Sequence, residues 1–283
     1  MIKIVTDTAT GITNELAAQY EVELIPLVVM FATQTLRDGV DISPSEFLQR
    51  LKASKEFPKT SQPPVGDFVA VFKKHLEAGH EVLCITLSSL LSGTYNSAET
   101  AKKQLGSDVA SRITLVDCKN LATAQAMMVI EAARMAKAGK PMADIVRRLD
   151  QMIPVTHLDI MLDTLEYLVK GGRVPAVQGL VGTLLQMKPI LTIKEGRLEP
   201  LERIRTRSRA MERLREIVDA AVRGKRNVMI GVAHTGLPEE ANSLARELRA
   251  KYGLSDCLVL DIPPAVSAHA GPGAIAVSYF VEG

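Results

Sequence analysis

Residues 82–105 limit the possible fold more than any other stretch, because they combine a strand, a tight turn and a helix in that order. Val82 to Leu87 is apolar and rich in β-branched residues, which predicts a buried strand. The small residues from Ser88 to Gly93 suit a tight turn. Beyond the turn, helical spacing relates Ala98, Ala101 and Leu105. This order is typical of an α/β fold.

The turn between this strand and this helix is suited to bind an anion. Backbone N–H groups at a helix start are free, and the helix dipole adds partial positive charge there. The hydroxyls of Ser89 and Ser92 are further donors. A purely structural interpretation stays open, because Ser92 or Thr94 is equally suited to cap the helix.

Strand and helix patterns alternate along the first half of the chain. We expect strands at residues 2–6, 24–30, 82–87 and 113–116, with helices between and after them. Ser43, Pro44 and Glu46 form a typical helix start. Residues 59–64 are interpreted as a loop that prolines stiffen. The alternation predicts parallel strands joined by crossover helices.

The pattern changes after a helix that ends near Met152, and Ile153-Pro154 is the predicted domain boundary. Beyond it, strands are expected near Asp159 and at residues 190–193, 198–204, 228–233, 257–262 and 274–281. Lys194 to Arg197 is interpreted as a hairpin turn, which requires antiparallel pairing. We therefore expect an α/β fold of two domains. Residues 1–152 form a parallel-sheet domain, residues 153–283 form a domain with a mixed or antiparallel sheet, and a ligand site lies between them.

Charge argues against two classes of partner. The chain has 34 Lys+Arg and 32 Asp+Glu, a near balance that is atypical of proteins committed to nucleic acid or to anionic membranes. Three glutamates, Glu202, Glu212 and Glu216, interrupt or flank the arginine-rich region at residues 203–215. The region lacks the aromatic residues that stack on bases. A solvated helix face is therefore expected there, with docking to an acidic surface of a partner protein as the functional alternative.

The composition also indicates what a pocket in this chain is made of. Hydrophobic residues make up 47% of the sequence, but aromatic residues only 4%, and there is no Trp. Aliphatic residues and 11 Met must therefore fill the interior. Pocket walls of Leu, Ile, Val and Met suit a long apolar ligand better than a flat ring.

The number of cysteines and the length of the apolar segments indicate the cellular compartment of the protein. Cys84, Cys118 and Cys257 are odd in number and predict buried reduced thiols, as in a cytosolic protein. The chain starts directly with a strand pattern, where a signal peptide would otherwise lie. The longest apolar stretch, at residues 24–32, is too short to cross a bilayer. We therefore expect a cytoplasmic protein without a transmembrane segment.

Four short motifs point to a known family. They are Thr60-Ser-Gln-Pro63, Ser88-Ser-Leu-Leu-Ser-Gly-Thr-Tyr95, Asp163-Thr-Leu-Glu-Tyr-Leu-Val-Lys-Gly-Gly-Arg173 and His269-Ala-Gly-Pro-Gly-Ala274. Their order and content resemble the DegV family of bacterial lipid-binding proteins, over essentially the whole chain. The resemblance implies a two-domain α/β fold with one fatty acid buried between the domains. Some members of the family are the fatty-acid-binding subunits of bacterial fatty acid kinase.

The resemblance also implies that lipid binding and phosphorylation are carried out by two separate proteins. The chain would be a lipid-binding subunit that does no chemistry alone, and a separate ATP-dependent kinase would phosphorylate the carboxylate. The resulting acyl phosphate would enter phospholipid synthesis. Because the sequence contains no GxxxxGK[ST] motif, we expect no ATP site in this chain. The fatty acid is the only expected ligand, with neither a cofactor nor a metal ion.

Six residues are candidates for the head-group site by match to the family motifs. Thr60 would hydrogen-bond the carboxylate together with Ser92 and the Gly93 amide, and Ser61 would shape the same loop. Arg173 and His269 would lie near the head group and serve phosphate transfer. Unperturbed histidine has a pKa of ~6.5, so we expect His269 to gain charge as negative charge develops beside it.

Departures from the family pattern are small. Pro64 replaces a small polar residue that is common after the Gln-Pro pair, and it could alter how freely the loop opens. The first turn reads Asp7-Thr8 where Asp-Ser is usual. Neither change touches the inferred head-group contacts.

Other interpretations of these residues stay open. Hydroxyls such as those of Thr60 and Ser61 often make only local turns, and Arg173 after two glycines is typical of an exposed helix end. The glycines at 179 and 182 predict close helix packing. The main functional alternative is an acyl ester or thioester hydrolase with Ser92 as nucleophile and His269 as base, although the turn lacks the Gly-x-Ser-x-Gly pattern.

Overall fold

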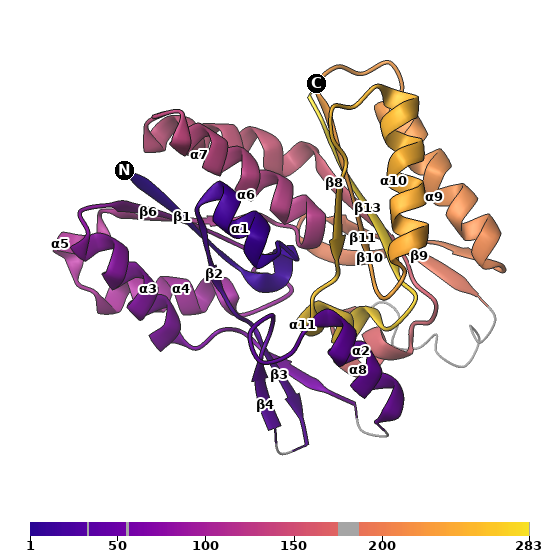
Figure 1. Cartoon of the computed structure of the whole chain (residues 1–283), viewed down its shortest axis with the longest axis horizontal. Coiled ribbons are helices and arrows are strands. Elements are labelled where there is room, and N and C mark those ends of the chain that lie inside the picture. The colour runs from indigo at the N-terminus through magenta and orange to yellow at the C-terminus, as the bar shows by residue number, and fades with distance from the viewer. Residues whose placement is uncertain (33, 55–56, 175–186, 283) are drawn as a thin grey trace.

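The computed structural model describes residues 1–32, 34–54, 57–174 and 187–282. Two α/β parts lie side by side, and each is built on its own sheet (Figure 1). The first part has a parallel sheet and the second a mixed sheet, which confirms the predicted fold class. The predicted packing site at glycines 179 and 182 lies outside the described residues.

The first sheet has four parallel strands with helices on both faces. In spatial order they are β2 (Val22–Ile25), β1 (Ile2–Asp7), β6 (Glu81–Thr86) and β7 (Ile113–Asp117). One face packs against α3 (Val65–Glu77) and α4 (Thr94–Gln104), through side chains such as Phe68 and Phe72. The other face packs against α1 (Asn14–Tyr20), α6 (Ala122–Lys137) and α7 (Met142–Met152).

The second sheet has six strands, and every pair except one is antiparallel. In spatial order they are β10 (Arg197–Ile204), β9 (Lys188–Lys194), β8 (Thr156–Met161), β13 (Ile275–Val281), β11 (Val228–His234) and β12 (Leu258–Asp261). Only β11 and β12 are parallel. The predicted hairpin turn is confirmed, because Lys194 pairs with Arg197. Helices α9 (Arg207–Val222) and α10 (Pro238–Tyr252) cover one face.

A third, small sheet corrects two predictions. It is antiparallel and contains β4 (Gln34–Arg37), β3 (Val28–Phe31) and β5 (Lys59–Ser61). Residues 59–61 are therefore a strand and not the start of a loop. The single strand expected at residues 24–30 is two strands, because the chain leaves β2 before Pro26 and enters another sheet after Leu27. Helices α2 (Pro44–Ala53), α8 (Glu166–Gly171) and α11 (Pro264–Ala270) lie near this sheet (Figure 1).

The predicted helix starts agree with the structure. Helix α2 begins after Ser43 with a complete capping box, in which Ser43 and Glu46 satisfy each other's backbone N–H groups. Short elements complete the chain: the one-turn helix α5 (Ser107–Ala110) and two 3-10 turns at Thr8–Thr10 and Ile153–Val155.

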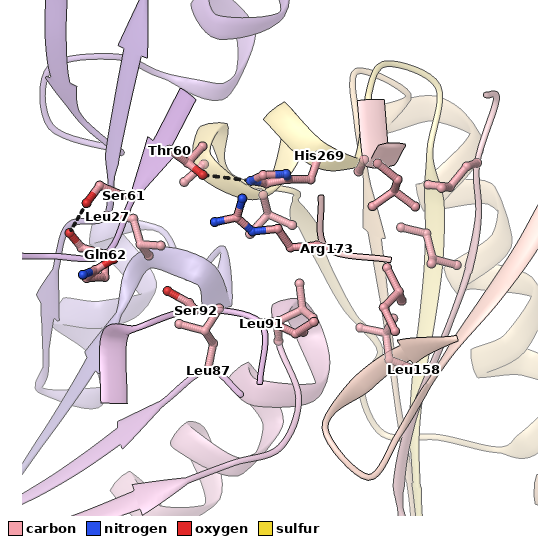
Figure 2. Close-up of a pocket in the computed structure, with 18 residues that line it drawn as sticks. Leu27, Thr60, Ser61, Gln62, Leu87, Leu91, Ser92, Leu158, Arg173 and His269 are labelled. Atoms are coloured by element: carbon pink, nitrogen blue, oxygen red, sulfur yellow. Dashed lines mark hydrogen bonds between the residues drawn. The ribbon is translucent and has the colours of Figure 1, made fainter. Parts of the chain in front are cut away.

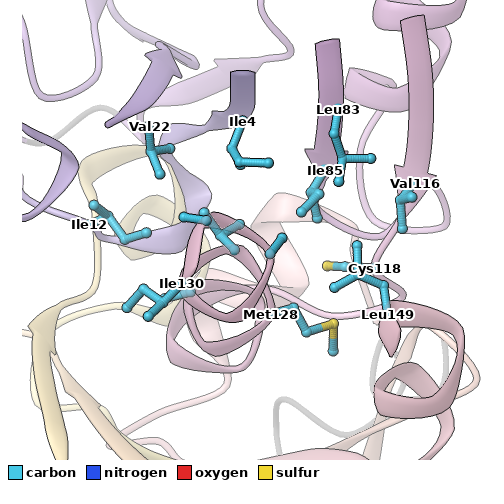
Figure 3. Packing of buried hydrophobic residues seen from close by; sticks show 14 of the residues in the cluster. Ile4, Ile12, Val22, Leu83, Ile85, Val116, Cys118, Met128, Ile130 and Leu149 are labelled. Atoms are coloured by element: carbon cyan, nitrogen blue, oxygen red, sulfur yellow. The ribbon is translucent and has the colours of Figure 1, made fainter. Parts of the chain in front are cut away.

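Helix α6 lies between the two large sheets. Every residue from Ala122 to Ile130 is buried, so the first part of the helix contacts protein on all sides. Met128 and Ile130 belong to the same buried cluster as Leu83 and Ile85 of the parallel sheet; Met128 lies near Leu149, and Ile130 lies near Ile12 (Figure 3). On the other side, the Thr123 hydroxyl oxygen lies 2.7 Å from that of Ser278 on β13. One helix thus joins the two sheets.

Two buried aspartates join further segments. Asp7 accepts hydrogen bonds from the backbone N–H groups of Ala9 (3.0 Å) and Leu87 (2.8 Å). Asp38 accepts one from the N–H of Ala265 (3.1 Å), at the start of α11. Burial raises the pKa of Asp7 to about 6 and that of Asp38 to about 7, although these hydrogen bonds oppose the shift.

These raised pKa values predict how stability depends on pH. The folded protein binds the Asp38 proton more tightly than the unfolded chain, so this contribution is complete below the ordinary pKa near 4. It is lost as the pH rises through about 7. We expect Asp38→Asn to remove this loss, so that between about pH 5 and about pH 8 the free energy of unfolding of the variant rises by at least about 1 kcal/mol relative to wild type.

Asp41→Asn is the matched control, because the neighbouring Arg37 lowers the pKa of Asp41 to about 2. Its contribution changes only below the ordinary aspartate range, so its difference from wild type should stay constant over the same interval. The free energy of unfolding is measured by urea denaturation at each pH. A constant difference for Asp38→Asn as well would contradict the prediction.

Candidate functional site

A cavity lies between the parallel-sheet part and the mixed-sheet part, and its walls are almost entirely aliphatic (Figure 2). The space between protein atoms is about 760 Å³, including the open mouth. Both parts contribute apolar side chains: Leu27, Leu87, Leu91, Leu121, Leu158, Ile160, Leu162, Leu168, Leu198, Ala265, Val266 and Ala270. The predicted aliphatic wall is therefore present, but the methionines that we expected in it do not line the cavity.

Polar side chains gather at one end of this cavity. They come from four separate segments and are Thr60, Ser61, Gln62, Ser92, Arg173 and His269. Five of the six residues predicted from the family motifs thus line one cavity, although up to 209 positions separate them in sequence. Figure 2 shows Thr60, Arg173 and His269 close together, with Ser92 below them.

The predicted site residues and the residues that line the cavity differ at Gly93 and Gln62. Gly93 does not line the cavity, and a Cβ atom at this position would lie 3.1 Å from the side chain of Gln62. Gln62 does line it, although we did not select it. The signal was available, because Gln62 belongs to the same motif as Thr60 and Ser61.

Thr60 and His269 form a direct hydrogen bond across the cavity mouth. The Thr60 Oγ1 atom, on β5, lies 2.8 Å from Nε2 of His269, on α11 (Figure 2). Strand β5 is held by β3, where Val29 pairs with Thr60. Helix α11 is held by Asp38, which accepts the N–H of Ala265. Both partners of this bond are therefore positioned by backbone interactions.

Ser92 serves the start of helix α4 and also lines the cavity. Its Oγ atom lies 2.8 Å from Oγ1 of Thr94 and accepts the Thr94 N–H at 3.3 Å. Helix α4 has no side-chain cap at Gly93, so the Ser92 hydroxyl serves the helix start locally. The same hydroxyl lines the cavity, beside the positive end of the helix dipole.

The charge at this end of the cavity comes from Arg173. Its Nη1 atom donates to the carbonyl oxygen of Gly171 at 2.6 Å. Burial, with a further contribution from Arg173, lowers the pKa of His269 to about 4. The imidazole is therefore neutral near pH 7, and our expectation of a ring poised to gain charge, which assumed an ordinary pKa, is revised.

A hydrolase needs a nucleophile bonded to a base that a third group orients. In the structure, the Nε2 atom of His269 bonds to Thr60, and the Ser92 hydroxyl bonds to Thr94. The other ring nitrogen, Nδ1, is buried without a hydrogen-bond partner among the described residues, so none of them orients the imidazole from that side. This arrangement does not support the serine nucleophile.

Three arginines of the arginine-rich region form ion pairs with acidic side chains. Arg213 forms ion pairs with Glu202 and Glu216. Arg215 pairs with Glu247 and Arg207 with Glu240. The structure thus agrees with a charged helix face in which both signs are mixed.

Residues 1–32, 34–54, 57–174 and 187–282 also bear on metal binding and on membrane insertion. Within them, no group of three or more His, Cys, Asp or Glu side chains is arranged to hold a metal ion. No helix in the same part of the chain has the length and apolar character needed to span a bilayer.

Comparison with known proteins identifies the family. The family model described as "Uncharacterised protein, DegV family" matches residues 1–282. A DegV domain-containing protein from Listeria innocua is 34% identical over 282 residues, which make up 99% of each chain.

Two solved structures are also similar. One is a DegV family protein from Thermus thermophilus that is described as binding fatty acid. It has a TM-score of 0.92 and 30% identity, and the match covers 99% of both chains. The other is a fatty acid (stearic acid)-binding protein from Eubacterium ventriosum, with a TM-score of 0.91 and 27% identity over 99% of this chain and 98% of the other. Sequence and fold agree along almost the entire chain, and the protein belongs to the DegV family.

Proposed function

We propose that this protein binds one long-chain fatty acid in the cavity between its two parts, with the carboxylate at the polar end. The observation that carries the proposal is the division of the cavity into a long aliphatic wall and one cluster of hydroxyls with a cation. The fatty-acid-binding family members named above support it.

The energetics favour a ligand of this kind. A chain of ~16 carbons gains about 12 kcal/mol of gross transfer free energy, at ~0.8 kcal/mol for each buried CH₂. The free-energy costs of association and of ordering the ligand reduce this gain, but the remainder is sufficient for tight binding. The carboxylate is the costly part, because an unpaired buried charge is destabilising by several kcal/mol. Thr60 and Ser92 supply hydroxyl donors, and Arg173 supplies positive charge.

The second part of the proposal is that the bound carboxylate is presented to a separate ATP-dependent kinase. The chain itself carries no phosphate-binding glycine motif. Arg173 is exposed, so the polar end of the cavity is close to solvent and open to a partner. The acyl phosphate formed there would enter phospholipid synthesis. The proposed location is the cytoplasm, where ATP is available to the kinase.

Replacement of Ser92 tests the head-group site. Ser92→Ala should weaken fatty acid binding by about 1–3 kcal/mol, as expected for the loss of a hydrogen bond to a charged group. Ser89→Ala is the matched control, because Ser89 lies in the same turn but does not line the cavity. Affinity is measured by titration of the delipidated proteins with stearic acid. Equal affinity of all three proteins would contradict the carboxylate site.

The same pair of variants tests the hydrolase alternative. We expect turnover of acyl esters and acyl-CoA by the wild type to stay at background. Robust turnover that is lost in Ser92→Ala but kept in Ser89→Ala would favour the hydrolase instead.

The next prediction concerns Arg173. An acyl phosphate carries more negative charge than a carboxylate, so a cation that stabilises it preferentially favours transfer more than binding. We expect Arg173→Ala to bind fatty acid within about tenfold of wild type, while kinase-dependent acyl phosphate formation falls by about a hundredfold or more. Arg147→Ala is the control, because Arg147 is an exposed arginine on α7. Equal losses of binding and transfer would make Arg173 a simple ligand clamp.

A further inference from the structure

Gly171, the last residue of α8, makes an unusually close approach to His269. A Cβ atom at this position would lie 2.0 Å from Nδ1 and 2.9 Å from Cε1 of the imidazole. The backbone of Gly171 is helical, so its conformation does not require glycine. The ring of His269 does require it, because no other side chain leaves room for the imidazole where it now lies.

This contact explains why one nitrogen of the imidazole has no partner. Nδ1 faces the Cα atom of Gly171, is buried, and makes no hydrogen bond to any residue in the described part of the chain. A proton on Nδ1 would therefore be a buried N–H donor without an acceptor, which is costly. An unprotonated Nδ1 leaves only an unused lone pair. In the neutral ring, the proton then belongs on Nε2, which lies 2.8 Å from Oγ1 of Thr60.

We propose that Gly171 is a positioning residue that holds His269 in the Nε2–H tautomer, so that Nε2 donates to Thr60 and the Thr60 hydroxyl proton is left to donate to the fatty acid carboxylate. A threonine hydroxyl has a single proton. If Thr60 donated to His269, no proton would remain for the ligand. The acceptor in this relay is the carboxylate of the proposed function, on which the inference rests.

Gly171 also positions the cation of the site. Its carbonyl oxygen accepts the hydrogen bond from Nη1 of Arg173 at 2.6 Å. The same residue thus contacts His269 through its Cα atom and Arg173 through its carbonyl group. Removing the space at Gly171 is expected to disturb the relay without removing any functional group from the site.

The tautomer can be observed directly by ¹⁵N NMR of histidine-labelled protein near pH 7, because protonated and unprotonated ring nitrogens have distinct chemical shifts. The protein has five histidines, and the His269 signals are assigned by their loss in His269→Gln. We expect Nε2 to be protonated and Nδ1 unprotonated. A proton on Nδ1, or an even mixture of tautomers, would overturn the proposal whether or not the protein binds fatty acid.

The role of Gly171 is tested by a double-mutant cycle with His269. Gly171→Ala should lower the affinity for stearic acid about tenfold or more, although alanine is the better helix former. In the His269→Ala background, which leaves room for the added methyl group, the same change should alter affinity by less than about threefold. Gly66→Ala is the control, since Gly66 is also helical and has nothing within 4 Å of its Cβ position.

Each outcome of the cycle decides the question. Wild-type affinity in Gly171→Ala, or equal losses in both backgrounds, would overturn the positioning role. If the wild-type protein itself binds no fatty acid, the proposed function fails, and the NMR measurement still decides the tautomer.

Discussion

The burial of helix α6 between two sheets is the constraint on which the rest of the structure depends. A surface helix has one apolar face, but the first half of α6 is buried all round. Its Met128 and Ile130 belong to the same buried cluster as side chains of the parallel sheet, and Thr123 bonds to Ser278 in the mixed sheet. Gly231 on β11 lets α6 approach closely, since a Cβ there would lie 2.9 Å from that of Thr123. The two sheets are thereby held at one distance.

The cavity follows from this arrangement, because its walls come from both parts of the molecule. Leu87 and Leu121 belong to the first part, and Leu158 and Ile160 to the second. Its polar end depends on longer connections. Asp38 holds α11, which carries His269, and the three-stranded sheet holds Thr60. The head-group site is thus held in place by Asp38 and by β3, neither of which lines the cavity.

Sequence patterns predicted the elements that are long or capped. The capping box at Ser43 marks the start of α2, and the hairpin at Lys194 to Arg197 marks an antiparallel pair. The three-residue strand β5 was missed, because so short an edge strand beside prolines has no readable period. Motif resemblance found five of the six polar residues named in the cavity and missed Gln62. The neutral state of His269 and the contact of Gly171 depend on burial and packing, which sequence spacing does not encode.

The proposed function requires a fatty acid to lie in this cavity with its carboxylate at the polar end. A crystal structure of the protein loaded with stearic acid tests the claim most directly. We predict one chain along the leucine-lined wall, with its carboxylate within hydrogen-bond distance of the hydroxyls of Thr60 and Ser92. A reversed ligand, with its methyl end against Thr60, would contradict the account, and so would electron density for the ligand only outside this cavity.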